Sequence, residues 1–138
     1  MKLSAKSEYA FLALIYLARK SEQGLLKIKE IAEAQKIPKK YLEQILIVLK
    51  RAGYVKSKAG ANGGYCLGRS PTKINLAEII RLIDGALAPI ESVSKYFYAP
   101  TPLEREEGMM RVLRKLRDHI AKVMETTTLA QIINNVKK

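Results

Sequence analysis

Three side chains between Pro38 and Arg51 have the chemistry to read nucleic-acid bases, namely Lys40, Glu43 and Gln44. Gln can pair with N6 and N7 of adenine, Lys can donate to O6 and N7 of guanine, and Glu can accept from N4 of cytosine. On a helix, these three lie opposite an apolar stripe with the spacing of a buried face. That stripe consists of Leu42, Ile45, Leu46 and Leu49. The alternative interpretation is an outer face that contacts only solvent.

The elements around this helix are those of a helix-turn-helix motif. A first short helix is expected over residues 28–35, and Pro38 is expected in the first turn of the second helix, where its missing N–H is not needed. Gly53 is expected to end the second helix in a left-handed conformation. The basic residues on the outer side of the second helix are Lys39, Lys40, Lys50 and Arg51.

A β-hairpin is predicted directly after this motif, with strands over residues 54–58 and 64–69 and a loop rich in glycine between them. The spacing of Gly60, Gly63 and Gly64 is similar to that of a phosphate-binding loop. Such a loop precedes a helix, however, and here a strand follows. The hairpin is therefore interpreted as the wing of a winged helix-turn-helix, with Lys56 and Lys58 close to DNA phosphates.

The positive charge of the chain is concentrated in the half that contains this motif. The formal net charge is +12. Residues 1–75 hold 15 Lys or Arg against 5 Asp or Glu, whereas residues 76–138 hold 10 against 8. This asymmetry is typical of a surface that binds phosphate. The alternative is a generally lysine-rich surface, although such surfaces tend to be balanced by glutamate.

The other residues that could carry chemistry are isolated from one another. The only cysteine, Cys66, excludes an intramolecular disulfide and a metal site built from cysteines alone, and leaves either a redox role or a small half-buried filler. The only histidine, His119, cannot form a metal site by itself. Since no nucleophile, base and orienting group come together, the sequence argues against an enzyme. The apolar run over residues 9–18 is too short to span a bilayer, and a cytoplasmic location is expected.

Capping patterns predict the remaining helices. Ser4 is expected to cap a helix over residues 5–20, and Asn75 with Glu78 to form a capping box for another that ends at Gly85. Thr128 and Gln131 are expected to start a short last helix that carries Val136. The buried face predicted for the first helix consists of Tyr9, Leu12, Ala13, Tyr16 and Leu17.

A long helix is predicted from Pro102 to about Glu125, begun by Thr101 as cap and Glu104 at its third position. Its apolar stripe steps by three and four residues, so it can pack on its own core or cross the same helix of a second subunit. A homodimer is the favoured interpretation. The residues predicted to form its interface are Met109, Val112, Leu113, Leu116, Ile120, Val123 and Met124.

Four segments stand in a fixed order over nearly the whole chain, and they read MKLSAKSEYAFLAL, IPKKYLEQIL, AGYVKSKAGANGGYCLGR and TTTLAQII. Together they resemble the Rrf-type winged-helix transcription regulators, the group that includes IscR, NsrR and CymR. The resemblance implies a homodimer bound to imperfect palindromes in double-stranded DNA. The second helix of the motif would start in the major groove, with contacts from Pro38, Lys40, Tyr41, Glu43 and Gln44. The wing would reach the minor groove, with contacts from Lys58, Ala59, Gly60, Asn62, Gly63 and Gly64.

The chain departs from the family pattern in two places. Many relatives carry an arginine at the wing tip, where this chain has Ala59. Cluster-binding members carry three cysteines in the loop before the long helix, whereas residues 86–101 hold none. The resemblance is therefore closest to the cluster-free CymR type, and no iron–sulfur cluster is expected. It also implies a role in sulfur or cysteine metabolism, with a metabolic enzyme as co-regulator.

These patterns predict a mainly α fold with a small β-hairpin wing. The winged helix-turn-helix is expected over residues 1–85, a loop over 86–101, and the dimerisation and C-terminal helices over 102–138. The expected function is that of a sequence-specific, homodimeric DNA-binding transcription regulator, acting as a repressor without a cofactor. The alternative is a sequence-tolerant nucleic-acid-binding protein that acts through charge alone.

Overall fold

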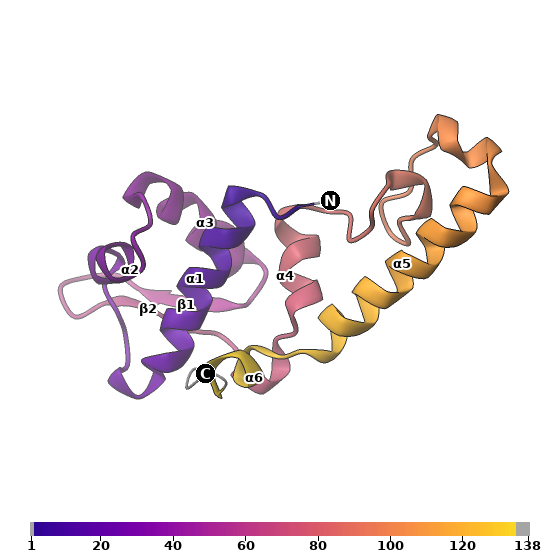
Figure 1. Ribbon diagram of the computed structural model, residues 1–138. Coiled ribbons are helices and arrows are strands. Elements are labelled where there is room, and N and C mark those ends of the chain that lie inside the picture. The colour runs from indigo at the N-terminus through magenta and orange to yellow at the C-terminus, as the bar shows by residue number, and fades with distance from the viewer. Residues whose placement is uncertain (1, 135–138) are drawn as a thin grey trace.

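The computed structural model describes residues 2–134, and Figure 1 shows their arrangement. The helices are α1 (Ala5–Arg19), α2 (Ile28–Gln35), α3 (Lys39–Arg51), α4 (Leu76–Ile83), α5 (Glu107–Thr126) and α6 (Leu129–Asn134). The strands are β1 (Val55–Lys58) and β2 (Gly64–Leu67), which form one antiparallel sheet. The predicted class, mainly α with a hairpin wing, is confirmed.

The main core is built around α1, which contacts α2, α3, α6 and β2 (Figure 1). Ser4 caps α1 as predicted, because its side chain accepts a hydrogen bond from the N–H of Ser7. The apolar stripe predicted for α3 is confirmed, since all four of its residues are at most 1% exposed. Burial of this stripe fixes the rotation of α3 and leaves its opposite face to solvent. The largest buried side chains of this core include Leu14, Leu17, Ile31, Leu42, Ile45, Leu46, Leu49 and Leu129.

The buried face of α1 differs from the predicted one. Ala13 and Leu17 are buried as expected, but Tyr9, Leu12 and Tyr16 are half-exposed. Small side chains let α1 lie close to neighbours on several sides, and Tyr16 keeps its hydroxyl at the surface in a hydrogen bond to a carboxylate. The other buried residues of the helix are Ser7, Ala10, Leu14 and Ala18.

The hairpin is shorter than predicted. Its ladder pairs Val55 with Leu67 and Lys58 with Gly64, so both strands stop within the predicted ranges 54–58 and 64–69. The reason is a turn at Gly53, whose φ of +86° confirms the predicted left-handed end of α3. Past the ladder, the N–H of Gly68 still donates to the carbonyl of Tyr54 at 2.8 Å.

The helix α4 links the main core to α5. It starts with the predicted capping box, in which Asn75 accepts from the N–H of Glu78 and Glu78 accepts from the N–H of Asn75. Ala77 and Ile80 on α4 pack with Ala121 on α5 in a second, smaller core. In Figure 1, α4 therefore lies between α1 and α5, and α5 extends away from the main core.

The long helix starts later than predicted, at Glu107 instead of Pro102. The hydroxyl of Thr101 does not cap it but bonds to Ser92 at 2.7 Å, and the carboxylate of Glu104 accepts from the hydroxyl of Tyr98. With both capping groups engaged elsewhere, residues 102–105 form a separate 3-10 turn. Nowhere in residues 2–134 is a helix long and apolar enough to cross a membrane.

The helix α6 returns to the main core, where Leu129 is buried and packs with α1. Thr128 and Gln131 form the predicted start of this helix through mutual hydrogen bonds. The N–H of Leu129 also donates to the carbonyl of Ile74 at 2.8 Å. The two helices of the predicted unit 102–138 therefore lie in different places. α5 extends away from the main core, whereas α6 packs on it. Val136 lies outside the described residues.

Candidate nucleic-acid interface

The outer face of α3 presents the polar side chains that the sequence assigned to it. Lys40, Glu43 and Gln44 are exposed, and so are two large side chains, Tyr41 at 53% and Ile47 at 50%. Folding leaves all five available for a ligand. Apolar atoms of Tyr41 and Ile47 can contact thymine methyl groups or sugars, while the other three can form hydrogen bonds to bases.

The turn before α3 fixes where this face begins. Lys36 adopts a left-handed conformation with φ +54°, and buried Ile37 donates to the carbonyl of Ala32 at 2.9 Å. Pro38 follows as the N-cap of α3, which differs from the predicted place inside the first turn. Pro38 and Lys39, which follows it directly, are both exposed.

The wing presents a second exposed surface, and its glycines are needed for different structural reasons. Gly60 has a φ of +99°, which favours glycine, and it lies at the exposed tip. Gly63, predicted as a DNA contact, is buried, and a Cβ there would lie 1.9 Å from the carbonyl oxygen of Lys58. Its place in the hairpin is therefore explained by the tight turn. The exposed candidates on the wing are Lys56, Lys58, Ala59, Gly60 and Asn62.

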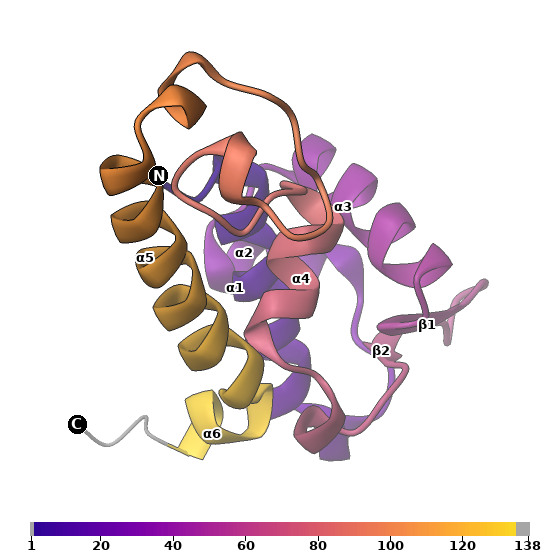
Figure 2. The same ribbon diagram turned by 90° about the vertical axis from the view of Figure 1, so that its right-hand side faces the viewer.

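The α3 face and the wing lie on the same side of the molecule. Figure 2 shows α3 and the sheet on the side opposite α5. Arg51 on α3 is exposed, as are the lysines of both elements. Among residues 2–134, the ion pairs of the structure involve Arg69, Arg81, Arg114 and Arg117, none of which belongs to α3 or the two strands. The lysines and arginine of α3 and the strands take part in none of these ion pairs. Their positive charge is therefore available to bind phosphate.

Sequence reasoning missed a third segment of the wing. Leu26 and Tyr65 exchange two backbone hydrogen bonds, of 2.9 and 2.8 Å, so residue 26 pairs with the outer edge of β2. The next residue, Lys27, donates from Nζ to the carbonyls of Gly60 and Ala61 at the wing tip. A single residue pair has no alternating pattern along the sequence, and so no periodic signal could reveal it.

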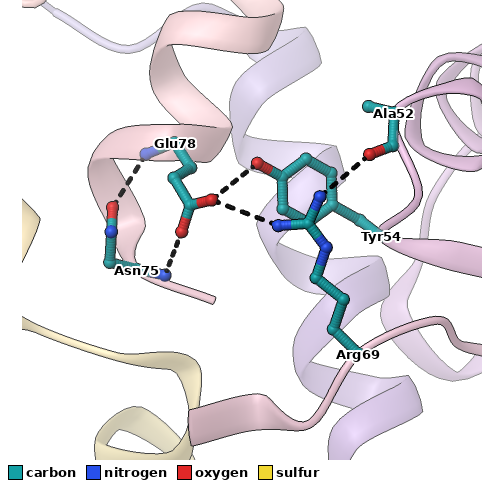
Figure 3. A network of polar contacts seen from close by, with 5 residues as sticks. All are labelled: Ala52, Tyr54, Arg69, Asn75 and Glu78. Atoms are coloured by element: carbon teal, nitrogen blue, oxygen red, sulfur yellow. Dashed lines mark hydrogen bonds and ion pairs between the residues drawn. The ribbon is translucent and has the colours of Figure 1, made fainter. Parts of the chain in front are cut away.

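A polar network holds the base of the wing against α3 and α4 (Figure 3). The carboxylate of Glu78 accepts from the hydroxyl of Tyr54 at 2.9 Å and from Arg69 at 3.3 Å. Arg69 stacks 4.2 Å above the Tyr54 ring and donates to the carbonyl of Ala52, just past the end of α3. From the sequence, Glu78 was expected only in its capping box with Asn75, and the structure adds this link to the wing.

Removal of the Tyr54 hydroxyl is expected to show this link in the pH dependence of stability. Burial, together with the hydrogen bond to Glu78, raises the pKa of Tyr54 above its ordinary value. Stability from this group is therefore fully present below about pH 10 and is lost as pH rises through the folded-state pKa. The free energy of unfolding of Tyr54→Phe should be about 1 kcal/mol lower than that of the wild type at neutral pH. Above pH 10 the wild type should lose stability more steeply in urea titrations. Parallel pH profiles for the two proteins would contradict the assignment.

The predicted dimer residues fall on two faces of α5. Leu113, Ile120 and Met124 pack against smaller cores of their own chain. The others are exposed by 44 to 61% and form one strip, here called the α5 stripe, of Met109, Val112, Leu116 and Val123. His119 lies exposed on the same helix. Cys66 is half-buried on β2 and pairs across the hairpin with Lys56.

Comparison with known proteins identifies the group to which this fold belongs. The family model Rrf2, described as an iron-dependent transcriptional regulator, matches residues 3–135. The transcriptional regulator CymR of Bacillus subtilis is 38% identical over 133 residues, covering 96% of this chain and 89% of that protein. The solved structure of CymR, named there the global cysteine regulator of B. subtilis, superimposes with a TM-score of 0.79 at 33% identity and covers 98% of both chains.

A second solved structure, IscR of T. potens, superimposes with a TM-score of 0.77 at 33% identity, over 99% of this chain and 89% of that one. The matches to CymR and IscR extend over α3, the wing and α5 alike. The family model and these relatives are described as transcriptional regulators. The chain therefore belongs to the Rrf2 family, and it is a DNA-binding transcription regulator with a winged helix-turn-helix fold.

Proposed function

We propose that this regulator is a homodimeric repressor that reads an imperfect palindrome in double-stranded DNA. The observation that carries the proposal is the exposed, polar face of α3 beside a basic wing on one side of the molecule. An α-helix fits the major groove of B-DNA, where each base pair presents a distinct set of donors and acceptors. The N-terminal part of α3 enters this groove, and the tip of the wing reaches the adjacent minor groove.

In this arrangement, each predicted residue has a role set by its chemistry. Gln44 pairs with adenine, Lys40 donates to guanine or phosphate, and Glu43 accepts from cytosine. Tyr41 and Pro38 provide apolar contact at the groove edge. The remaining charges bind backbone phosphates and so contribute affinity without sequence preference. These phosphate contacts come from Lys39, Arg51, Lys56 and Lys58, with Ala59, Gly60 and Asn62 at the wing tip.

The α5 stripe supports the homodimer. Its exposed apolar residues recur at intervals of three, four and seven along the helix, the spacing of a helix that crosses another. On the other face of α5, toward α4, lies a groove of about 640 Å³ whose apolar walls include Ile80, Leu87, Ile120 and Met124. Exposed apolar side chains gathered along one helix, as in the α5 stripe, are typical of a protein interface. A second copy of α5 has the matching stripe. A two-fold dimer then requires a palindromic site.

The residues of this chain do not fit an iron–sulfur cluster, although the family description names iron. A cluster is held by four thiolate or imidazole ligands. The chain has one cysteine and one histidine, and they belong to β2 and α5, which lie on opposite sides of the molecule (Figure 2), so a subunit does not bring even two such ligands together. Within residues 2–134 no three His, Cys, Asp or Glu side chains gather as metal ligands. We propose regulation without a cluster.

Protein purified without oxygen is therefore expected to be colourless and to contain no stoichiometric iron. The measurement is a visible absorption spectrum together with iron analysis of the same sample. An absorption band from sulfur-to-iron charge transfer, with iron at a fixed ratio to protein, would contradict the proposal.

The similarity to CymR, the global cysteine regulator of B. subtilis, favours target genes of sulfur or cysteine metabolism and a metabolic enzyme as co-regulator. The test is selection of genomic fragments with the purified protein, followed by sequencing. Enrichment of palindromes upstream of sulfur-metabolism genes is the expected result. The excess of lysine in residues 1–75 favours one alternative, a sequence-tolerant binder. Equal enrichment of unrelated fragments would support that alternative, because charge alone does not distinguish sequences.

A further inference from the structure

We propose that Lys27 is a positioning residue that holds the tip of the wing in the conformation required for DNA contact. The Nζ of Lys27 donates to two successive carbonyls, those of Gly60 and Ala61, at the tip. Lys27 lies at the start of α2, more than thirty residues before the tip of the wing in the sequence. This inference rests on the proposed contact between wing and DNA, and it assigns a role to a residue outside α3 and the hairpin.

The wing tip needs a support from outside the hairpin. The ladder ends at the pair of Lys58 and Gly64, and the loop beyond it holds one backbone bond, from the N–H of Gly63 to the carbonyl of Gly60 at 3.1 Å. Gly60 has a positive φ and no side chain, so the loop gains little stiffness from its own residues. An ammonium group that binds two carbonyls restrains the loop where local structure does not.

The backbone next to Lys27 fixes the direction from which the ammonium group reaches the tip. Leu26 pairs with Tyr65 on the edge of β2, and a Cβ at Gly64 would lie 2.5 Å from the carbonyl oxygen of Leu26. The wing is therefore in close contact with this segment at the end of the ladder nearest its tip. A lysine at residue 27 is long enough to run along the edge of the hairpin to its tip, and its charge strengthens the bonds to the carbonyls.

The Lys27 ammonium also supplies a positive charge at a tip whose own residues, Ala59 to Gly63, carry none. Two roles follow from this placement, and they predict different results. A positioning residue changes the mobility of the free protein, whereas a phosphate contact changes only the affinity for DNA and its dependence on salt. Measurements on the free protein and on its DNA complex therefore separate the two.

The experiment compares Lys27→Met, which keeps the aliphatic stem, with Lys27→Arg, which keeps the charge and the donors. Lys29→Met is the matched control, because Lys29 is an exposed lysine on the same helix and loses the same charge. Backbone ¹⁵N order parameters of Gly60 and Ala61 are measured in the free full-length protein. Affinity is measured by fluorescence anisotropy on a duplex of about 30 base pairs, three helical turns, taken from the most enriched genomic fragment.

In Lys27→Met, the order parameters at the tip should fall from about 0.85 to below about 0.6, and they should stay unchanged in the other two variants. The Kd of Lys27→Met should rise about tenfold, since binding must then order roughly one more residue of backbone. Lys27→Arg and Lys29→Met should both stay within about threefold of the wild type.

Unchanged order parameters in Lys27→Met would overturn the positioning role. If the salt dependence of Kd then fell by about one unit, Lys27 would be a simple phosphate contact. A mobile tip with unchanged affinity would overturn the link to DNA binding, and with it the proposed contact of the wing. If the wild-type protein enriches no palindrome among the genomic fragments, that result would instead contradict the proposed function itself.

Discussion

Glutamate at both Val112 and Leu116 is expected to convert the protein into a monomer. Both side chains are exposed on the α5 stripe, at 61 and 44%, and contribute to neither of the smaller cores. In a dimer they would be buried at the crossing of two helices, where an unpaired charge is strongly destabilising. A monomer places only one winged helix-turn-helix on the operator, whereas a dimer places two that are joined. The affinity for the operator should therefore fall by about a hundredfold or more, because the second domain no longer binds as part of the same molecule.

Sedimentation velocity measures the oligomeric state of this variant, and circular dichroism verifies its helix content. The matched control is Arg111→Glu, which changes the net charge by the same two units from an exposed position of α5 outside the stripe. That variant should stay dimeric. Ile120 is less suitable for substitution, although the sequence pointed to it, because it packs against α4 and a charge there would damage the subunit itself. A Val112→Glu, Leu116→Glu protein that stays dimeric would place the interface elsewhere.

Local signals in the sequence were sufficient for the helix-turn-helix. The stripe of α3 has four apolar residues at helical spacing, and all four are buried. The capping box joins Asn75 and Glu78, three positions apart, and the left-handed turn at Gly53 needs one residue. In each of these cases, the interaction that decides the structure joins residues within one or two helical turns, so a pattern along the chain records it.

Contacts between distant residues account for the errors. The start of α5 was misplaced because Thr101 bonds to Ser92, outside the helix that it was expected to cap. The same local sequence would cap a helix if that partner were absent. The buried face of α1 was partly wrong for a related reason, since this helix has neighbours on several sides and a single-face pattern does not describe it.

The candidate interface was predicted in outline but not in its supports. The exposed polar face of α3 follows from the burial of its other side, which the sequence shows directly. The supports of the wing do not follow in this way. Lys27 reaches a tip more than thirty residues away, and Arg69 joins the ends of α3 and α4 through Glu78. Neither lysine nor arginine has a periodic pattern that reveals such a partner.

Gln44→Ala is expected to separate the reading of sequence from binding through charge. Gln44 is exposed on α3, next to Glu43 and one turn after Lys40, so its loss should leave the fold intact. Loss of one bidentate contact to a base should cost about 1–3 kcal/mol on the preferred duplex and little on a random duplex. Fluorescence anisotropy with both duplexes, at several salt concentrations, measures the two losses.

Lys58→Ala is the comparison, because Lys58 is exposed on the wing at the last pair of the ladder. It should weaken binding to both duplexes alike and reduce the slope of log Kd against log salt by about one unit, as expected for one phosphate contact. The two variants together determine what α3 does. If Gln44→Ala weakens both duplexes equally, this face touches only the DNA backbone, and the sequence-tolerant binder becomes the better account. If it weakens only the preferred duplex, base recognition is assigned to α3 and the phosphate contacts to the wing.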